Sequence, residues 1–383
     1  MDNARDQVTG RPVVVVVHNR EQRTIATGVE IRNRTKLTAL SKLAEPIAIG
    51  FDPRHDDPEK SLIRLDNSLL KAGQTPPHLF VLDSTIARNL IPVIRARYKE
   101  ARIVVDFHNV ESLLLKQQDR ARFPKWLRPL SSLVNRRRWR RARETDMLVA
   151  AQADRIWVCS QVDAARLGSM KAGLDIDVIA NLSPIEPEQD RLARRSAPSR
   201  FLFIGHLGYA PNKRAVRFLV KNVMPRLRGR LDGARLIVAG YRPNERLLRL
   251  LRRSSDVEVH GSPSDLAPLY EGATVFVAPL FEGGGTRIKI LEAACMGLPI
   301  VASALAVEGL GFVPGTHYVR AETATEFASR LVALSGDEMQ RRTIARQAMQ
   351  HVGEQFTQEA ITSAIAASLS RLDGQWPMGI SRE

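Results

Sequence analysis

The sequence predicts an α/β protein made of two successive doubly wound, Rossmann-like domains. A chain of 383 residues exceeds what one hydrophobic core usually holds. Short apolar runs alternate with helical stretches, and they do so in two sets on either side of a polar stretch at residues 186–200. We therefore expect a first domain over residues 1–190 and a second over 191–355. A terminal helix over 356–383 is expected to pack back on the first domain.

The apolar runs predict buried parallel strands, because they are short, rich in branched residues and end at polar residues or glycine. Those of the first domain cover residues 13–17, 46–51, 79–83, 102–108, 155–160 and 177–181. Those of the second cover residues 201–206, 235–240, 257–261, 274–279, 299–303 and 317–320. The intervening segments have helical periodicity, which is typical of strand–helix–strand units in an open sheet.

The composition favours a cytoplasmic protein. No apolar run approaches the roughly 18 residues that span a bilayer, and the first residues lack the apolar core of a secretion signal. Two cysteines, Cys159 and Cys295, lie in apolar segments without the spacing of a disulfide framework or a metal site. We predict that both are buried core thiols.

The formal net charge of +16 calls for an anionic partner. The densest basic cluster, residues 123–146, interleaves arginines with apolar and aromatic residues. Its members are Trp126, Leu127, Leu130, Leu133, Val134, Trp139, Arg136, Arg137, Arg138, Arg140, Arg141 and Arg143. As a helix it fits an anionic membrane surface, and the ordinary alternative is a solvated helix that packs its leucines inward. Nucleic acid is not expected, because no reader module accompanies the charge.

Residues 279–303 predict an anion-binding site, because a strand end, a glycine turn, a helix start and the next strand follow one another. The turn contains Gly283, Gly284 and Gly285, which let a ligand approach the backbone closely. Thr286 is placed to cap the following helix, whose first N–H groups would face the same ligand. Arg287 and Lys289 add two cations in the first turn, where positive charge opposes the helix dipole. A negative ligand is therefore expected there.

Glycines also end other predicted strands of the second domain. Gly205, Gly240 and Gly261 each stand at such an end, where open α/β sheets bind their ligands. In the first domain the first strand is followed by HNREQRTIATG, without the GxGxxG fingerprint. A dinucleotide cofactor is therefore not expected.

Longer motifs show a resemblance to a known family. FIGHLGYAPNKRAVRFL, ARLIVAG, VEVHGSPSDLAPLYEGATVFVAPL and GTRIKILEAACMGLPIVASALAVEGL follow one another over residues 201–312. With these motifs the second half resembles the retaining group 1 glycosyltransferases (glycosyltransferase family 4) of the GT-B fold. In the first half the resemblance rests on VVDFHNVES, AQADRIWVCS and VIANLSP. It implies two domains facing a central cleft, a nucleotide diphosphate sugar donor, a glycan or lipid-linked acceptor, and no metal or other cofactor.

The resemblance assigns roles to two side chains. Glu292 matches the second glutamate of the family's Glu-x7-Glu motif, which implies hydrogen bonds to the nucleotide ribose. His108 matches a histidine close to the transferred sugar. Each has a structural alternative: Glu292 pairs with Arg287 or Lys289, and His108 pairs with Asp106 or Glu111.

The sequence departs from the family pattern in two places. Gly284 stands where the first motif glutamate is expected, so Glu282 or backbone N–H groups are the candidates to replace it. The family's Lys-Gly pair is also absent, and Pro211 and Asn212 stand near its place. We infer that the two cations of the helix start, Arg287 and Lys289, neutralise the diphosphate instead.

The resemblance implies a hexosyltransferase-type enzyme that moves a sugar with retention in cell-surface polysaccharide biosynthesis. Backbone donors at Gly284 and Gly285, together with Arg287 and Lys289, would stabilise the departing diphosphate. Two alternatives stay open. The missing glutamate argues for a non-catalytic nucleotide-sugar-binding or scaffold protein of a glycan assembly complex, and the fold also serves nucleotide-sugar epimerases, whose own motifs are not evident.

Overall fold

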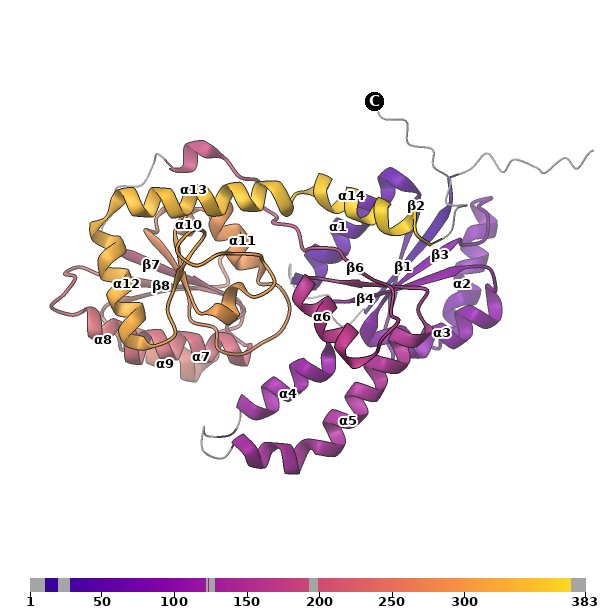
Figure 1. The fold of residues 1–383 in the computed structure, drawn as a ribbon, viewed down its shortest axis with the longest axis horizontal. Coiled ribbons are helices and arrows are strands. Elements are labelled where there is room, and N and C mark those ends of the chain that lie inside the picture. Colours follow the sequence, from indigo (N-terminus) through magenta and orange to yellow (C-terminus); the bar gives the residue numbers. More distant parts are fainter. Residues whose placement is uncertain (1–10, 20–27, 122, 124–127, 193–198, 373–383) are drawn as a thin grey trace, which may run out of the picture. The chain divides into compact units, whose positions relative to one another are not determined.

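The protein is a two-unit α/β structure in the computed structural model, which describes residues 11–19, 28–121, 123, 128–192 and 199–372. Unit 1 comprises Met1–Ser112, Arg136–Ala180 and Gln358–Glu383, and unit 2 comprises Leu113–Asn135 and Asn181–Thr357. Each unit has one six-stranded sheet, with helices on both sides (Figure 1). The predicted class, α/β with two doubly wound parallel sheets, is confirmed.

The sheet of unit 1 has the order β2-β1-β3-β4-β5-β6 and every pairing is parallel. Its strands are β1 (Val13–Asn19), β2 (Glu45–Phe51), β3 (Leu79–Asp83), β4 (Arg102–Phe107), β5 (Arg155–Val158) and β6 (Ile176–Val178). Its helices are α1 (Gly28–Leu43), α2 (Pro58–Lys71), α3 (Ser84–Arg97), α6 (Gln161–Met170) and α14 (Gln358–Leu369). Two further helices include residues of both units, α4 (Glu111–Ala121) and α5 (Arg128–Gln152). The apolar run of β1 is buried throughout, as expected for a parallel strand covered on both faces.

The sheet of unit 2 has the order β12-β11-β10-β7-β8-β9, again with parallel pairs. Its strands are β7 (Arg200–Ile204), β8 (Arg235–Gly240), β9 (Val257–Gly261), β10 (Val275–Ala278), β11 (Ile300–Ala302) and β12 (Val319–Arg320). Its helices are α7 (Ala210–Phe218), α8 (Met224–Leu227), α9 (Glu245–Arg252), α10 (Ala267–Glu271), α11 (Ile288–Cys295), α12 (Ala324–Gly336) and α13 (Glu338–Gln355). Short helical turns lie at Gln189–Leu192, Leu219–Val223 and Ala304–Val307.

The strand orders place a topological switch point in each unit. In unit 2 the chain runs from β7 outward through β8 and β9, and then from β10 outward in the opposite direction. β7 and β10 are therefore neighbours whose following loops diverge, and this is where doubly wound sheets hold ligands. In unit 1 the corresponding neighbours are β1 and β3.

Helix α14 is tied to unit 1 by a chain of hydrogen bonds. Trp157 Nε1 donates to Ser368 Oγ at 2.7 Å, and that hydroxyl donates to Asp177 Oδ2 at 2.6 Å. All three side chains are buried, so these bonds are shielded from water. α14 also packs on α1, which places this helix in the first unit.

Both cysteines, Cys159 and Cys295, are buried and neither forms a disulfide, which confirms their prediction as core thiols. Burial raises the pKa of Cys159 to about 12 and that of Cys295 to about 11. Among the described residues, no helix has the length and apolar character needed to cross a bilayer.

Candidate nucleotide-sugar site

The glycine loop that follows β10 lies at the switch point of unit 2 and is part of the candidate site. Gly283 has φ 110° and Gly285 has φ 70°, a region that favours glycine. Gly284 is exposed. Within the described chain, neither Gly284 nor Gly285 donates its N–H to another backbone group. The loop therefore offers backbone donors to an incoming anion.

Arg287 holds this loop in shape. Its guanidinium donates to the carbonyl oxygens of Gly283 and Gly285, each at 2.6 Å. The side chain is only 8% exposed, so most of its donors point into the loop and not toward solvent. Its expected contact with a diphosphate stays a prediction, and the geometry shows a second role in which Arg287 fixes the glycine turn.

The expectation that Thr286 caps helix α11 is wrong. The residue at the N-cap of α11 is Arg287, which makes no side-chain cap. The Thr286 hydroxyl instead accepts a hydrogen bond from Asn181 Nδ2. Asn181 lies 105 residues earlier in the chain, so the local sequence gave no sign of this competing partner.

The Lys289 ammonium group lies beside Asn212 and Phe203 at the switch point of unit 2. Its Nζ donates to Asn212 Oδ1 at 2.9 Å and lies 4.9 Å from the centre of the Phe203 ring. A Cβ added to Gly205 would stand 2.6 Å from this Nζ, and one added to Gly240 would stand 1.8 Å from the Gly205 carbonyl oxygen. Gly205 thus leaves the space that the ammonium group occupies, and Gly240 allows the Gly205 backbone to approach its own.

The charged groups of Lys289 and Glu292 are partly shielded from water. Burial lowers the pKa of Lys289 to about 7, and the nearby Arg287 charge acts in the same direction. Burial also raises the pKa of Glu292, against the opposing effects of Tyr270 and Lys289. An anionic ligand beside Lys289 would restore its positive charge, because the charged form would then gain a partner.

Glu292 lies one turn further along α11 than Lys289. Its Oε2 accepts a hydrogen bond from the Tyr270 hydroxyl at 2.8 Å. Tyr270 is fully buried and stacks on Phe276, with ring centres 6.2 Å apart. Among the ion pairs of the described residues, Glu292 takes part in none, so the alternative pairing with Arg287 or Lys289 is not found. One carboxylate oxygen is held by tyrosine, while the prediction that Glu292 binds a ribose remains to be tested.

Two predicted residues, Glu282 and Gly261, lie outside the group of contacts around Lys289 and Glu292. Glu282 is 9% exposed, and its Oε1 accepts from Arg214 Nε, so this carboxylate is engaged in an ion pair. Gly261 ends β9, the edge strand, and is exposed. A Cβ there would meet only Pro243 Cγ at 3.7 Å, an ordinary contact. The structure therefore gives no steric reason for glycine at position 261.

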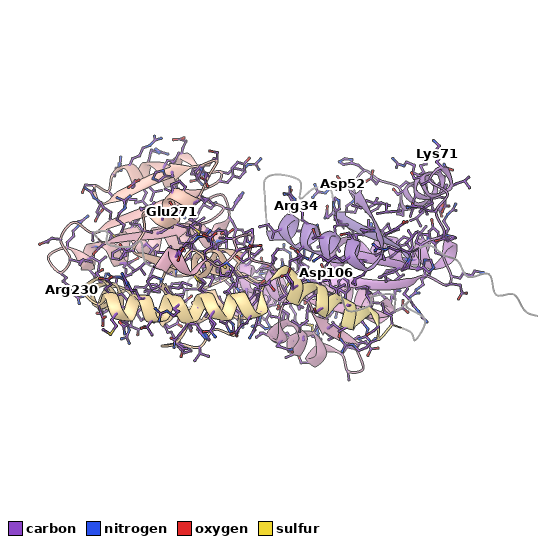
Figure 2. The ribbon with its side chains drawn as sticks, turned by 90° about the horizontal axis from the view of Figure 1, so that it is seen from above. Arg34, Asp52, Lys71, Asp106, Arg230 and Glu271 are labelled. Carbon is purple, nitrogen blue, oxygen red and sulfur yellow. The ribbon has the colours of Figure 1, made fainter. Side chains whose placement is uncertain are left out.

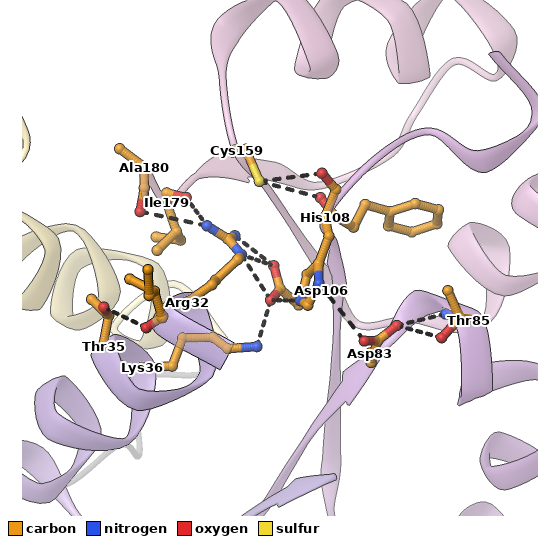
Figure 3. Close-up of polar contacts among 12 residues, drawn as sticks. Arg32, Thr35, Lys36, Asp83, Thr85, Asp106, His108, Cys159, Ile179 and Ala180 are labelled. Carbon is orange, nitrogen blue, oxygen red and sulfur yellow. Dashed lines mark hydrogen bonds and ion pairs between the residues drawn. The ribbon is translucent and has the colours of Figure 1, made fainter. Parts of the chain in front are cut away.

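In unit 1, His108 follows β4 and is held by a buried carboxylate (Figure 3). His108 Nε2 lies 3.0 Å from Asp106 Oδ2, and its Nδ1 lies 3.8 Å from Asp83 Oδ2. Asp106 is thus the partner of His108, one of the two alternatives that the sequence left open. The imidazole is only 10% exposed, so both carboxylates act on it through a partly desolvated medium.

Two cations that the sequence analysis missed surround Asp106. Arg32 Nη2 and Lys36 Nζ each lie 2.5 Å from its carboxylate, and both side chains are 2% exposed. Arg32 also donates to the Ile179 carbonyl at 2.6 Å. These charges hold the pKa of Asp106 well below its usual range even though burial acts in the opposite direction. Figure 2 shows the contrast between Asp106, in the interior, and exposed charges such as Lys71 at the surface. The available signal was a pair of cations four residues apart on one helix face.

Polar groups gather near His108 at the ends of β3 and β4. Burial, Asp146 and Asp83 together raise the pKa of Glu111 to about 7. Four buried polar atoms in this region have no hydrogen-bond partner among the residues that the structure describes: Asp83 Oδ2, Ser84 Oγ, Asn109 Oδ1 and Ser112 Oγ. Because unsatisfied buried polar groups are costly, they suit a ligand that carries hydroxyl groups.

Each unit is a doubly wound parallel sheet, and in unit 2 a glycine-rich loop follows the switch-point strand β10. Residues 198–337 match the family model described as glycosyl transferases group 1. The resemblance that the sequence motifs show to the group 1 glycosyltransferases is therefore confirmed for this part of the chain.

Solved structures agree on the fold. Sucrose-phosphate synthase from Thermosynechococcus elongatus superposes with a TM-score of 0.69 at 16% identity, covering 94% of this chain and 99% of that one. HepE of Anabaena, in complex with UDP and glucose, gives a TM-score of 0.65 at 14% identity, covering 94% of this chain and 100% of its own. At these identities the likeness establishes the GT-B fold.

A curated relative shares part of the sequence. An uncharacterized 44.6 kDa protein in the cps region of Klebsiella pneumoniae is 25% identical over 171 residues. The alignment covers 43% of this chain and 44% of that protein, so the chain matches less than half the length of this relative.

Proposed function

We propose that this protein transfers a sugar from a nucleotide diphosphate donor to a glycan or lipid-linked acceptor, with retention, in the assembly of a cell-surface polysaccharide. The observation that carries the proposal is the Lys289 ammonium group at the switch point of unit 2. Asn212 holds it, and Gly205 leaves the space around it. A diphosphate is the ligand that such a desolvated cation and a loop of free backbone donors suit best.

The chemistry of the transfer uses these groups directly. The bond between the anomeric carbon and the diphosphate oxygen breaks, and a bond from the acceptor oxygen to that carbon forms on the same face. The acceptor's proton passes to an oxygen of the departing diphosphate. Lys289 and the N–H groups of Gly284 and Gly285 would stabilise the negative charge on the leaving group, which is larger in the transition state than in the bound donor.

The donor and the pathway are supported by the comparisons. HepE was solved in complexes with UDP-glucose and with UDP and glucose, which makes UDP-glucose a first donor to test. The Klebsiella relative is encoded in a cps region, which supports a role in polysaccharide biosynthesis. Both statements concern those proteins and come to this chain as part of the proposal.

The test is turnover of nucleotide sugars by the purified full-length protein. Release of nucleoside diphosphate from one member of a panel that includes UDP-glucose, with slow hydrolysis even without acceptor, is expected. The rate should fall strongly for Lys289→Met and stay unchanged for Lys221→Met, an exposed lysine of the same unit. A protein that releases no diphosphate from any donor, with or without glycan acceptors, contradicts the proposal.

A second function is favoured by one observation, and it is a non-catalytic nucleotide-sugar-binding protein of a glycan assembly complex. Gly284 supplies no carboxylate where the family has one, and Glu282 is engaged with Arg214. Tight binding of a nucleotide sugar without hydrolysis or transfer would identify this function. Release of an isomerised sugar would instead identify the epimerase.

A further inference from the structure

The solvent-exposed side of helix α5 combines apolar and strongly basic side chains. Leu133 is 72% exposed and Val134 is 73% exposed, although both are large aliphatic residues. The ordinary alternative, a helix that packs its leucines inward, does not hold for Leu133. Trp126 and Leu127, which belong to the same predicted basic cluster, lie outside the described residues.

The arginines of α5 follow directly after these two apolar residues. Six of them are exposed: Arg136, Arg137, Arg138, Arg140, Arg141 and Arg143. Two acidic residues, Glu144 and Asp146, lie within the same stretch. Glu144 pairs with Arg140 at 3.3 Å, while Asp146 is buried and accepts from the Ser112 N–H. The stretch therefore keeps a strong excess of positive charge at its surface.

Helical geometry brings the two kinds of residue onto one side. At 100° per residue, Leu133, Arg137, Arg140 and Arg141 fall within about a quarter of the helix circumference. Leu148, 46% exposed, lies near the same direction about four turns further on. The opposite side of α5 is buried through Ser131, Val149 and Ala150. We define the basic surface of α5 as Leu133, Val134, Arg136, Arg137, Arg140 and Arg141.

We propose that the basic surface of α5 is a docking site for an anionic lipid membrane, with Leu133 and Val134 inserted at the headgroup level and the arginines on lipid phosphates. An anionic bilayer satisfies both features, because it offers a dense negative charge and an apolar layer directly beneath it. Nucleic acid would satisfy the arginines but would leave the two aliphatic side chains in water. This inference does not depend on the proposed sugar transfer.

The test is flotation of the full-length protein with lipid vesicles. Binding to vesicles that contain phosphatidylglycerol, and not to vesicles of phosphatidylcholine alone, is expected. Replacing four arginines together (R136Q, R137Q, R140Q and R141Q) should weaken this partitioning by at least about 100-fold. Replacing the aliphatic pair (L133S and V134S) should weaken it about 10-fold, because less apolar surface then leaves water.

A matched control is available in unit 2. Helix α9 exposes Arg246, Arg249 and Arg252, while its leucines are buried (Leu247 and Leu251) or half-buried (Leu248 and Leu250). Replacing these three arginines by glutamine removes similar charge where no fully exposed aliphatic side chain is adjacent, and vesicle binding should be retained. Circular dichroism and urea unfolding of each variant show whether it is folded, independently of the membrane readout.

Three results overturn the inference: equal binding to neutral and anionic vesicles, unchanged flotation of the L133S and V134S variant, or equal losses in the α9 control. Tighter binding to a duplex oligonucleotide than to anionic vesicles, measured by fluorescence anisotropy and insensitive to L133S and V134S, overturns it in favour of nucleic acid.

Discussion

Replacing Lys289 by methionine should make the protein more stable and less able to bind its donor. The folded state lowers the pKa of Lys289 from 10.5 to about 7, so at pH 6 the protein holds a proton that its surroundings disfavour. This difference corresponds to about 4–5 kcal/mol of lost stability. Loss of the Asn212 hydrogen bond and the residual solvent contact of Lys289 reduce the expected gain to about 2–4 kcal/mol.

The sign of the pH dependence follows from proton counting. Between about pH 7 and pH 10.5 the unfolded lysine is protonated while the folded one is neutral, so wild-type stability rises with pH. The advantage of Lys289→Met should therefore be full at about pH 6 and nearly gone at about pH 10. Urea unfolding followed by far-UV circular dichroism at both pH values measures it. Lys221→Met, on an exposed residue of the same unit, is the control and should show no such dependence.

Donor binding supplies the second half of this prediction. Losing a charged contact to the diphosphate should weaken UDP binding by about 10- to 100-fold. The variant would then be more stable and functionally weaker, which is the behaviour of a residue kept for its ligand. A variant destabilised equally at both pH values, or one with unchanged UDP affinity, refutes the reasoning.

Three further predictions concern other groups. Gly240→Ala should lower the free energy of unfolding by about 3 kcal/mol or more, because its Cβ would stand 1.8 Å from the Gly205 carbonyl oxygen. In the same thermal unfolding experiment, Gly261→Ala should be close to neutral. Glu111→Gln should stabilise the protein by about 2–3 kcal/mol at pH 8 and not at pH 4. The reason is that the pKa of Glu111 is raised to about 7, so wild-type stability falls as the pH rises from 4.5 to 7. Urea unfolding at both pH values checks this, and an effect that does not depend on pH contradicts it. Asp106→Asn should cost about 3–5 kcal/mol in urea unfolding, because the buried charges of Arg32 and Lys36 would lose the carboxylate that both of them contact. A loss below about 1 kcal/mol would contradict the ion-pair account.

The fold was predictable because parallel strands covered on both faces must be continuously apolar. All twelve predicted strands coincide with observed ones, differing mainly by a residue or two at their ends. Strand order was not predictable in this way, because hydrophobic runs do not specify which strands become neighbours. The switch point between β7 and β10 appears only in the structure.

The site was predictable in its residue types and less so in its contacts. The glycine loop and Lys289 were visible because they are close in sequence. The partner of Lys289, Asn212, lies 77 residues away, and Thr286 takes a distant partner in place of a helix cap. Arg32 and Lys36 lie outside the motifs that carry the family resemblance, and their counterion Asp106 is about 70 residues further on. Such long-range pairs leave no local pattern in a single sequence.

The central claim is that the switch point of unit 2 binds a nucleoside diphosphate through Lys289. Isothermal titration of the wild-type protein with UDP, GDP, ADP and dTDP tests it most directly, with Lys289→Met and Lys221→Met as the paired variants. The account predicts saturable binding of at least one nucleoside diphosphate, weaker binding of the matching monophosphate, and a large loss only for Lys289→Met. Failure of every nucleoside diphosphate to bind, or equal affinities for the two variants, would contradict it.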